Sequence, residues 1–410
     1  MNTVPGKNNI AIVFSIFSLI LFIYIFTAGR FKFIFPTHSA NYFSHLSYSF
    51  LMGRLYLVNP TWTSDLSIWH DKKYVYWGPT PVLFILPLVA LFGVNLSDAL
   101  YTSAAGFLSV FFVYLILNEL NKLNISRLSE IKKILICLFF AFGTVHYYLS
   151  VNGGIWFTSQ IFSTMYAFVA IFFLLRYLTY QNLSNLLLSS IFFNLAAFGR
   201  NTFIFYLPLF IILIVYKRFN LKHLVLFSLI LFIFLSANFL YNFLRFGSIF
   251  ETGHSIHQVA LKFAADKASY GTINPIYIPK NFKYMFLNFA QPTDKFPFFK
   301  FDQDGNSIFF TSSLFLLLFL LIKKQFWKEK LCKILNIFCL IGIFGSITFL
   351  LNYFSTGWIQ LGYRYLLDVI PLMLLLIAEV VSGVPIFIIL LLTALSIIVT
   401  SLGTVWLIFQ

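Results

Sequence analysis

Acidic residues are rare in this chain, with 13 Asp and Glu among 410 residues, so each can be weighed as a catalytic group. The first polar segment, residues 36–81, carries five side chains able to accept a proton: His38, His45, Asp65, His70 and Asp71. A carboxylate within hydrogen-bonding reach of a substrate hydroxyl can act as a general base. We take Asp65, in a Thr- and Ser-rich turn, as the leading base candidate and Asp71, in the turn-like sequence HDKK, as the second.

A second polar segment, residues 245–306, holds a further group of acids and histidines. These are Glu251, His254, His257, Asp266, Asp294, Asp302 and Asp304. Glu251 follows Arg245 in YNFLRFGSIFETG and is a candidate substrate contact, whereas the histidines are interpreted as surface or packing groups. Neither segment contains HExxH or another tight metal-binding spacing, so no metal site is predicted, and a divalent cation stays an open alternative. Surface helices are expected over 255–269 and 280–290.

Three arginines lie where apolar runs meet polar sequence. Arg200 sits in AAFGRNT between two apolar runs, Arg245 ends another run, and Arg364 lies in GYRYLLDVIP. A guanidinium binds phosphate through two hydrogen bonds, so all three are candidate substrate contacts, although anchoring in lipid headgroups stays open for Arg200 and Arg245. Asp368 follows Arg364 by four residues, which places both on one face of an α-helix, either as a functional pair or as a structural one. The remaining candidate substrate contacts are Tyr365, His38 and Trp77.

The composition of the chain indicates which kind of secondary structure positions these residues. Apolar residues make up 60% of the chain and charged residues 10%, against roughly 25% charged residues in soluble proteins. Repeated long apolar runs predict membrane helices, which satisfy their own backbone hydrogen bonds. The net charge of +15 is explained by basic topology signals in short connections, so no nucleic-acid partner is expected. The three cysteines form no CxxC motif and predict neither a disulfide nor a metal cluster.

The sequence predicts an all-α polytopic membrane protein with about 11 transmembrane helices plus juxtamembrane helices, in a single membrane domain over 1–410. The predicted spans are 9–28, 98–118, 134–150, 156–178, 183–198, 201–217, 223–243, 307–322, 334–352, 362–381 and 385–407. A twelfth apolar run, 81–95, is short and follows Pro79 and Pro81, so we interpret it as a juxtamembrane or re-entrant helix.

The positive-inside rule gives the expected orientation. Connections 119–133, 217–222 and 323–333 are strongly basic, which favours the cytoplasmic side for them and for the N-terminus. An outer loop at 29–97 and a large outer loop at 245–306 then share the other side. We therefore expect a multi-pass protein of the plasma membrane with its functional site extracytoplasmic.

The order of these motifs resembles the GT-C superfamily of membrane glycosyltransferases, which includes aminoarabinose transferases and protein O-mannosyltransferases. The resemblance rests on HLSYSFLMGRLYL in the first outer loop and on the proline-rich GPTP at 78–81. It also rests on YNFLRFGSIFETG at the head of the large loop and on GYRYLLDVIPLMLLL in a late span. It implies a GT-C-like fold and an inverting enzyme that transfers a hexose or pentose from a polyprenyl-phosphate donor to a glycan, lipid or protein acceptor on the extracytoplasmic side.

The resemblance also implies residue roles. An acid in the first outer loop would act as base, and Arg200 falls where relatives often have a basic residue near the lipid phosphate. The chain departs from the pattern directly after its first span, where PTHSANYF contains His38 but no carboxylate. Either Asp65 has taken the role, or the base comes from elsewhere, or the chain is not catalytic. The alternative function is a non-enzymatic flippase or transporter of lipid-linked glycans.

Overall fold

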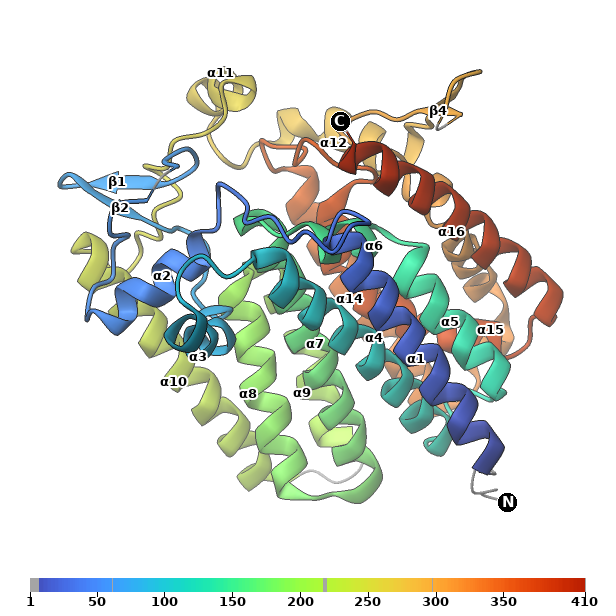
Figure 1. Ribbon diagram of the computed structural model, residues 1–410. Coiled ribbons are helices and arrows are strands. Elements are labelled where there is room, and N and C mark those ends of the chain that lie inside the picture. The colour runs from blue at the N-terminus through green and yellow to red at the C-terminus, as the bar shows by residue number, and fades with distance from the viewer. Residues whose placement is uncertain (1–6, 61, 217–219, 297, 410) are drawn as a thin grey trace.

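The structure is a computed structural model that describes residues 7–60, 62–216, 220–296 and 298–409. Helices dominate the fold, and the described residues contain only two short two-stranded sheets. Figure 1 shows the long helices side by side, with the start of α1 at one end of the bundle and the end of α16 at the other. The architecture is that of an all-α membrane protein, as the sequence predicts.

Six helices in the described residues are long and apolar enough to cross a membrane. They are α1 (Lys7–Ala28), α4 (Asp98–Lys122), α7 (Ile155–Tyr180), α10 (Leu221–Phe246), α14 (Lys330–Leu351) and α16 (Ile386–Ile408). A seventh candidate is a pair, α5 (Glu130–Phe142) and α6 (Val145–Asn152), which is bent by 56° at its break. The break falls at Gly143 and Thr144, where Thr144 adopts an extended conformation and caps α6 by accepting a hydrogen bond from the His146 amide at 3.2 Å.

Shorter apolar helices occupy the other predicted ranges. They are α8 (Leu183–Gly199), the 3₁₀ helix η1 (Asn201–Tyr206) with α9 (Leu207–Tyr216), α13 (Ile308–Thr311) with the 3₁₀ helix η4 (Ser313–Ile322), and the 3₁₀ helix η6 (Arg364–Asp368) with α15 (Ile370–Val381). Helix α3 (Val82–Phe92) has 11 residues. At 1.5 Å per residue it is about 16 Å long, which is too short to cross a hydrocarbon core of about 30 Å by itself.

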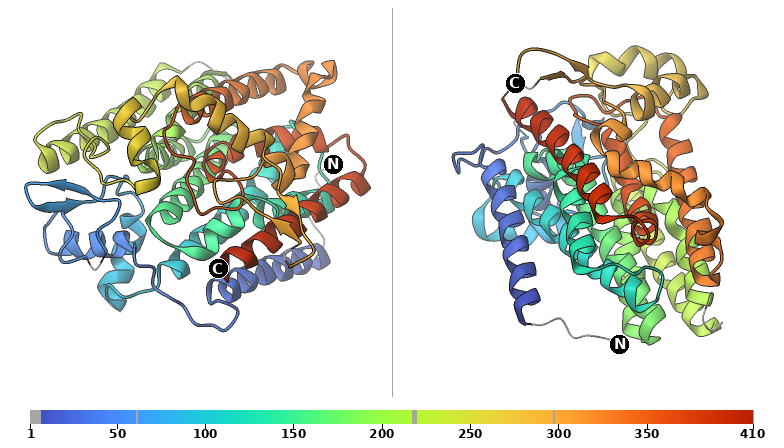
Figure 2. Two further views of the ribbon diagram at one scale, coloured as in Figure 1. Left: turned by 90° about the horizontal axis from the view of Figure 1, so that it is seen from above. Right: turned by 90° about the vertical axis from the view of Figure 1, so that its right-hand side faces the viewer.

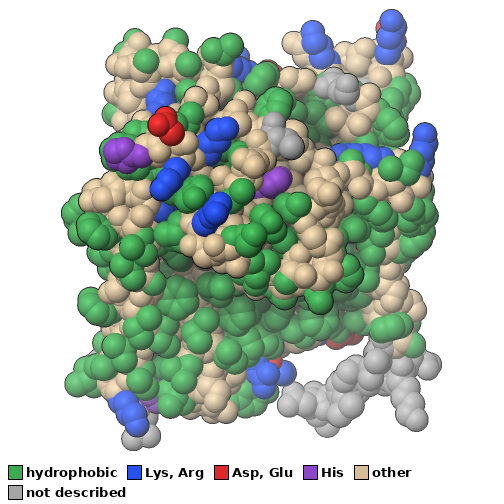
Figure 3. All heavy atoms as spheres, turned by 60° about the vertical axis from the view of Figure 1, so that its left-hand side comes forward, with side chains coloured by type: hydrophobic (Ala, Val, Ile, Leu, Met, Phe, Trp, Pro, Cys, Tyr) green, Lys and Arg blue, Asp and Glu red, His purple; other side chains and the backbone are tan. Residues whose placement is uncertain are grey.

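Helix α7 forms the centre of the bundle, and its neighbours cover almost its whole length. It packs mainly against α4 and α8. In contrast, α10 lies at the edge, and apolar side chains such as Phe232 and Leu240 are more than half exposed. Figure 3 shows apolar side chains across the middle of one face, with charged side chains towards its two ends. This distribution suits a bilayer, because only the middle of the molecule would contact lipid tails.

The two polar segments lie together at the end of the bundle opposite the start of α1 (Figures 1 and 2). The first forms α2 (Tyr42–Leu51) and the hairpin of β1 (Ser67–Trp69) and β2 (Lys72–Tyr74). The second forms α11 (Leu261–Tyr270), the 3₁₀ turn η2 (Pro275–Tyr277), α12 (Ile278–Phe282), the π-helical turn η3 (Lys283–Leu287), and the strands β3 (Gln291–Pro292) and β4 (Phe299–Lys300). A further 3₁₀ turn, η5 (Lys324–Trp327), follows η4.

Hydrogen bonds join the two polar segments directly. The Ser67 hydroxyl donates to the Gly253 carbonyl at 2.8 Å, although 186 positions separate the two residues. The backbone amide of Gln258 donates to the Leu66 carbonyl at 3.0 Å. These bonds hold the start of the second segment against the turn that carries Asp65.

The end of the first segment is fixed by close packing against α8. A Cβ atom added to Gly78 would lie 1.8 Å from the carbonyl oxygen of Phe198. Only glycine therefore fits at this position of the GPTP sequence. The contact sets the position of the chain that leads into α3 and of Arg200, which directly follows α8.

Candidate functional site

A cavity of about 950 Å³ lies where the two polar segments meet the ends of α7, α8 and α10. Its size falls within the range of small-molecule sites. The cavity brings together seven of the ten residues that the sequence singles out: Asp65, Arg200, Arg245, Arg364, Tyr365, His38 and Trp77. Residues far apart in the chain thus share one space, to which both outer segments contribute.

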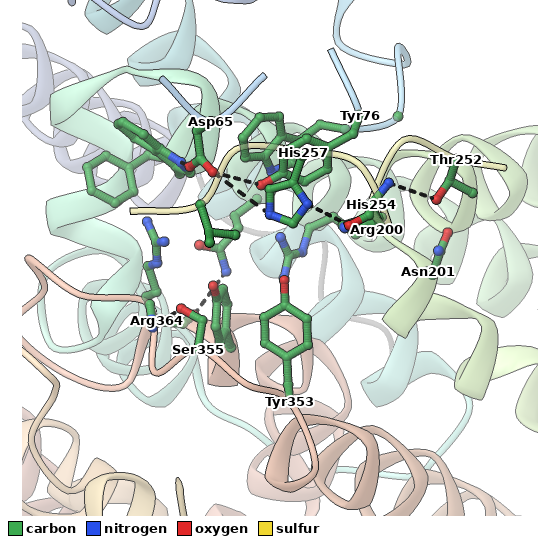
Figure 4. Close-up of a pocket in the computed structure, with 18 of the residues that line it drawn as sticks. Asp65, Tyr76, Arg200, Asn201, Thr252, His254, His257, Tyr353, Ser355 and Arg364 are labelled. Atoms are coloured by element: carbon green, nitrogen blue, oxygen red, sulfur yellow. Dashed lines mark hydrogen bonds and ion pairs between the residues drawn. The ribbon is translucent and has the colours of Figure 1, made fainter. Parts of the chain in front are cut away.

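Asp65 lies at the wall of this cavity in a strained turn, with φ at +63°. Aspartate tolerates this left-handed conformation better than most residues. The Trp156 indole nitrogen donates to one carboxyl oxygen at 2.6 Å, and the Tyr76 hydroxyl donates to the other at 3.4 Å (Figure 4). Burial raises the pKa of Asp65, and the Trp156 hydrogen bond and the positive charge of Arg364 partly oppose that rise. A carboxyl with a raised pKa suits general acid–base chemistry.

Arg200 forms a buried ion pair with Asp368. Its Nε lies 2.9 Å and 3.0 Å from the two carboxyl oxygens, and its Nη2 lies 2.7 Å from Oδ2. The Thr202 hydroxyl donates to the same Oδ2 at 2.7 Å. The Arg200 side chain still lines the cavity, but its charge is neutralised.

The expected pairing of Asp368 with Arg364 is wrong. The segment Arg364–Asp368 is a 3₁₀ helix, with three residues per turn, so residues four apart differ in direction by about 120°. The Asp368 side chain therefore pairs with Arg200, and the Arg364 side chain lines the cavity.

Arg364 is buried and has no hydrogen bond or ion pair through its guanidinium to any described side chain or backbone group. Its exposed fraction is 6%, and its Nε is buried without a partner. The Arg364 guanidinium makes cation–π contacts with the rings of Phe157 and Tyr365, whose centres each lie 5.2 Å from Cζ. A buried charge without a counter-ion is costly, so this side chain marks a place for an anion.

Arg245 is also buried, but its donors are occupied. Its Nη1 donates to the Val75 carbonyl at 2.7 Å and its Nη2 to the Asn242 side chain at 2.8 Å. The guanidinium also stacks on Tyr241, 3.9 Å from the ring centre. These contacts tie α10 to the first polar segment and leave Arg245 at the cavity wall.

His38 joins the cavity to the start of α4. Its backbone amide donates to Asp98 at 3.0 Å, and the same carboxylate accepts from Gly154 at 2.6 Å. The imidazole accepts from the Ala40 amide at 3.0 Å through Nδ1 and packs edge-on against Trp156. Burial lowers the pKa of His38, which favours the neutral ring. His38 therefore supports the residue that holds Asp65.

Three of the ten predicted residues do not line the cavity. Asp71 is exposed at the turn between β1 and β2. Glu251 binds within its own loop, accepting from the Gly253 amide at 2.6 Å and the Ser255 hydroxyl at 2.5 Å. Asp368 lies behind Arg200.

Sequence reasoning did not single out Arg30 or Trp156, and it interpreted His254 and His257 as surface or packing groups, whereas all four line the cavity. Arg30 has φ at +55°, donates to Asn152 at 2.8 Å and keeps Nη1 buried without a partner. Trp156 comes two residues after the pair Gly153–Gly154, at the start of an apolar run, and this break is a signal that could have drawn attention to it. The histidines carry no such signal, because their place depends on contacts with the first segment.

No three His, Cys, Asp or Glu side chains among the described residues are grouped so as to hold a metal ion. Comparison with protein-family models gives no match for this chain, and comparison with curated proteins gives none either. The function of the cavity is therefore argued from its residues.

Proposed function

We propose that this protein is a membrane glycosyltransferase of the GT-C type that moves a sugar from a polyprenyl-phosphate donor to an acceptor, with inversion at the anomeric carbon. The acceptor is a glycan, a lipid or a protein that presents a hydroxyl. One observation carries the proposal: a partly buried carboxyl, that of Asp65, and a buried guanidinium without a counter-ion among the described residues, that of Arg364, line the same cavity. The first suits a base, and the second suits a phosphate.

The reaction uses both groups in one displacement. The acceptor hydroxyl gives its proton to Asp65 while its oxygen forms a bond to the anomeric carbon. The bond between that carbon and the phosphate oxygen breaks, and the phosphate leaves with the electron pair. Its negative charge rises by one, and Arg364 donates hydrogen bonds to it in a partly dehydrated site.

The lipid part of the donor needs an apolar site near this phosphate. A second cavity, of about 410 Å³, is lined almost entirely by apolar side chains of η4, α14 and α15. Arg364 and Tyr365 line the first cavity, and Leu366 lines the second. This arrangement supports a donor whose charged group and hydrocarbon chain lie on opposite sides of one short helix.

The proposal includes a topology of eleven crossings. These are the six long helices, the bent pair α5–α6, and the four shorter units at 183–199, 201–216, 308–322 and 364–381. The N-terminus is cytoplasmic, and the cavity opens on the outer side of the plasma membrane. Variants Lys328→Cys and Asp71→Cys, both at exposed positions, test this orientation. In intact cells an impermeant maleimide should label the second and not the first; the reverse pattern would overturn it.

The function is tested with purified protein in lipid nanodiscs and a panel of labelled polyprenyl-phosphate hexoses and pentoses. Asp65→Asn and Arg364→Gln should each reduce sugar transfer about 100-fold or more. The matched controls are Asp71→Asn and Arg54→Gln, which change exposed residues outside the cavity and should retain transfer. Full activity of Asp65→Asn excludes Asp65 as the base. Donor binding by the wild-type protein without turnover would favour a carrier instead.

A further inference from the structure

Arg30 brings a second guanidinium to the cavity from the N-terminal part of the chain. Helix α1 ends at Ala28, and Arg30 follows it in a left-handed backbone conformation, with φ at +55°. This conformation is strained for a residue with a β-carbon, and such strain persists only where the surrounding structure holds the residue in place. The side chain of Arg30 lines the same cavity as Arg364.

Only part of the Arg30 guanidinium has a partner. Its Nη2 donates to the Asn152 side-chain oxygen at 2.8 Å, whereas its Nη1 is buried without a hydrogen-bond partner. No ion pair among the described residues includes Arg30. The charge of Asp98 acts on Arg30, but the two oxygens of Asp98 accept from the backbone amides of His38 and Gly154. Burial lowers the pKa of Arg30, so its positive charge is poorly compensated.

Tyr148 connects Arg30 with Arg364. Its side chain is buried, lines the cavity and hydrogen-bonds with Asn152, to which Arg30 also donates. The positive charges of Arg364 and Arg30 both act on the Tyr148 hydroxyl. Figure 4 shows that Arg364 extends into the cavity towards the Asp65 carboxyl. The cavity therefore holds two guanidinium groups near one tyrosine, and neither forms an ion pair with an acid among the described residues.

Two uncompensated cations in one part of a cavity match a ligand with two negative charges. Like charges repel, and a buried charge without a counter-ion is costly, so an anion that contacts both groups relieves both effects. A phosphodiester, such as a polyprenyl-phosphate sugar, carries one negative charge. A phosphate monoester carries up to two, because its second pKa is about 6. A sugar-linked diphosphate also carries two.

We propose that Arg30 and Arg364 form a subsite for a phosphate ligand with two negative charges. In the proposed reaction the bond between the anomeric carbon and the phosphate oxygen breaks, and the electron pair stays on the phosphate. Arg364 matches the charge that the donor already carries, and Arg30 matches the charge that appears as this bond breaks. An interaction that strengthens in the transition state raises the rate. This inference rests on the proposed function and extends it to the leaving group.

The test measures binding and needs no turnover. The probes are three lipids of one chain length: polyprenyl phosphate, its methyl ester, and the methyl ester of polyprenyl diphosphate. At pH 8 the wild-type protein in nanodiscs should bind polyprenyl phosphate about tenfold more tightly than its methyl ester. Arg30→Gln should bind these two lipids with affinities within about twofold, and Arg30→Lys, which keeps the charge, should retain part of the preference. Lys32→Gln, at an exposed position outside the cavity, is the matched control.

The two ligands that fit the subsite give different patterns. A subsite for the leaving phosphate prefers the monoester. A subsite for the second phosphate of a diphosphate donor binds the two monophosphates alike and the diphosphate about tenfold more tightly. Arg30→Gln removes the preference in both cases. A wild-type protein that binds all three lipids alike, or an Arg30→Gln variant that keeps the wild-type preference, overturns the inference and leaves the proposed function standing. A wild-type protein that shows the preference but turns over no donor keeps the phosphate subsite and removes the transferase.

Discussion

Arg200 and Asp368 form a bidentate ion pair across 168 positions of sequence, with three contacts between 2.7 and 3.0 Å. The pair joins the end of α8 to the 3₁₀ helix η6, and η6 also carries Arg364. The contact between Arg200, at the cavity wall, and the fully buried Asp368 therefore helps to determine where the unpaired guanidinium of Arg364 lies.

Removing the acid of this pair should destabilise the protein. Asp368→Asn leaves Arg200 buried without its counter-ion, which costs about 3–5 kcal/mol for buried pairs and should lower the melting temperature by several degrees. Asp266→Asn breaks the more exposed pair with Lys280, which contributes about 0–1 kcal/mol, and is the control. Equal melting temperatures for the two variants in detergent would contradict this role.

Asp65→Asn should separate activity from stability. Burial raises the pKa of Asp65 in the folded protein, so stability from this residue is present at low pH and lost as the pH rises through the raised pKa. At neutral pH the burial of this carboxyl therefore weakens the fold. The variant should lose transfer about 100-fold while its melting temperature stays equal or rises by up to about 4 °C. A marked fall in melting temperature would assign Asp65 a structural role.

Trp156→Phe should change the pH dependence of transfer. The indole donates to the Asp65 carboxyl at 2.6 Å and favours its ionised form. A hydrogen bond to a charged group contributes about 1.5–3 kcal/mol. Its loss should therefore shift the acidic limb of the pH–rate profile to higher pH by about one to two units. Trp69→Phe, in the exposed part of the hairpin, should leave the profile unchanged. The measurement is the transfer rate between pH 4 and 8, expressed as kcat/KM.

Acid should loosen the contact between the two outer segments. Burial lowers the pKa of His254 to about 3 and that of His257 to about 4, against an ordinary value of 6.5. The unfolded chain then binds more protons than the folded one, so stability is lost as the pH falls from about 6.5 towards 4, by up to about 1.4 kcal/mol per pH unit for each histidine. Melting temperatures at pH 7 and pH 5 measure this loss. The double variant His254→Gln/His257→Gln should reduce the difference, and His70→Gln should not.

Gly78→Ala should disrupt the site from a distance. Its Cβ would lie 1.8 Å from the Phe198 carbonyl oxygen, so the GPTP segment must move away from α8. We expect a lower melting temperature and loss of transfer. A Cβ at Gly383 has no neighbour within 4 Å, which makes Gly383→Ala the matched control. Wild-type behaviour of both variants would show that the close approach is unimportant.

Much of the fold could be predicted from the sequence, because long apolar runs leave little choice but helices. The predicted range 156–178 corresponds closely to α7, and 98–118 to α4. Breaks inside the runs were not predicted: 134–150 is divided by the 56° bend, and 362–381 begins with a 3₁₀ helix. Apolar periodicity cannot distinguish these forms, since all of them bury the same side chains.

The candidate site was predictable only in part, for a related reason. The scarcity of acids drew attention to Asp65, and the ends of apolar runs drew attention to Arg200 and Arg364. The ion-pair partner of Asp368 could not be derived from the sequence. Arg364 lies four residues away from it, whereas the actual partner, Arg200, lies 168 positions away. His257 was interpreted as a surface or packing group, because only the contacts between Ser67 and the second segment bring it to Asp65.

The bond between Ser67 and Gly253 also has a consequence for biosynthesis. A ribosome makes the turn around Asp65 long before the strand-like stretch that will cover it, and later still the short helix that carries Arg364. The cavity that Asp65 and Arg364 line is therefore incomplete until the last quarter of the polypeptide has been made.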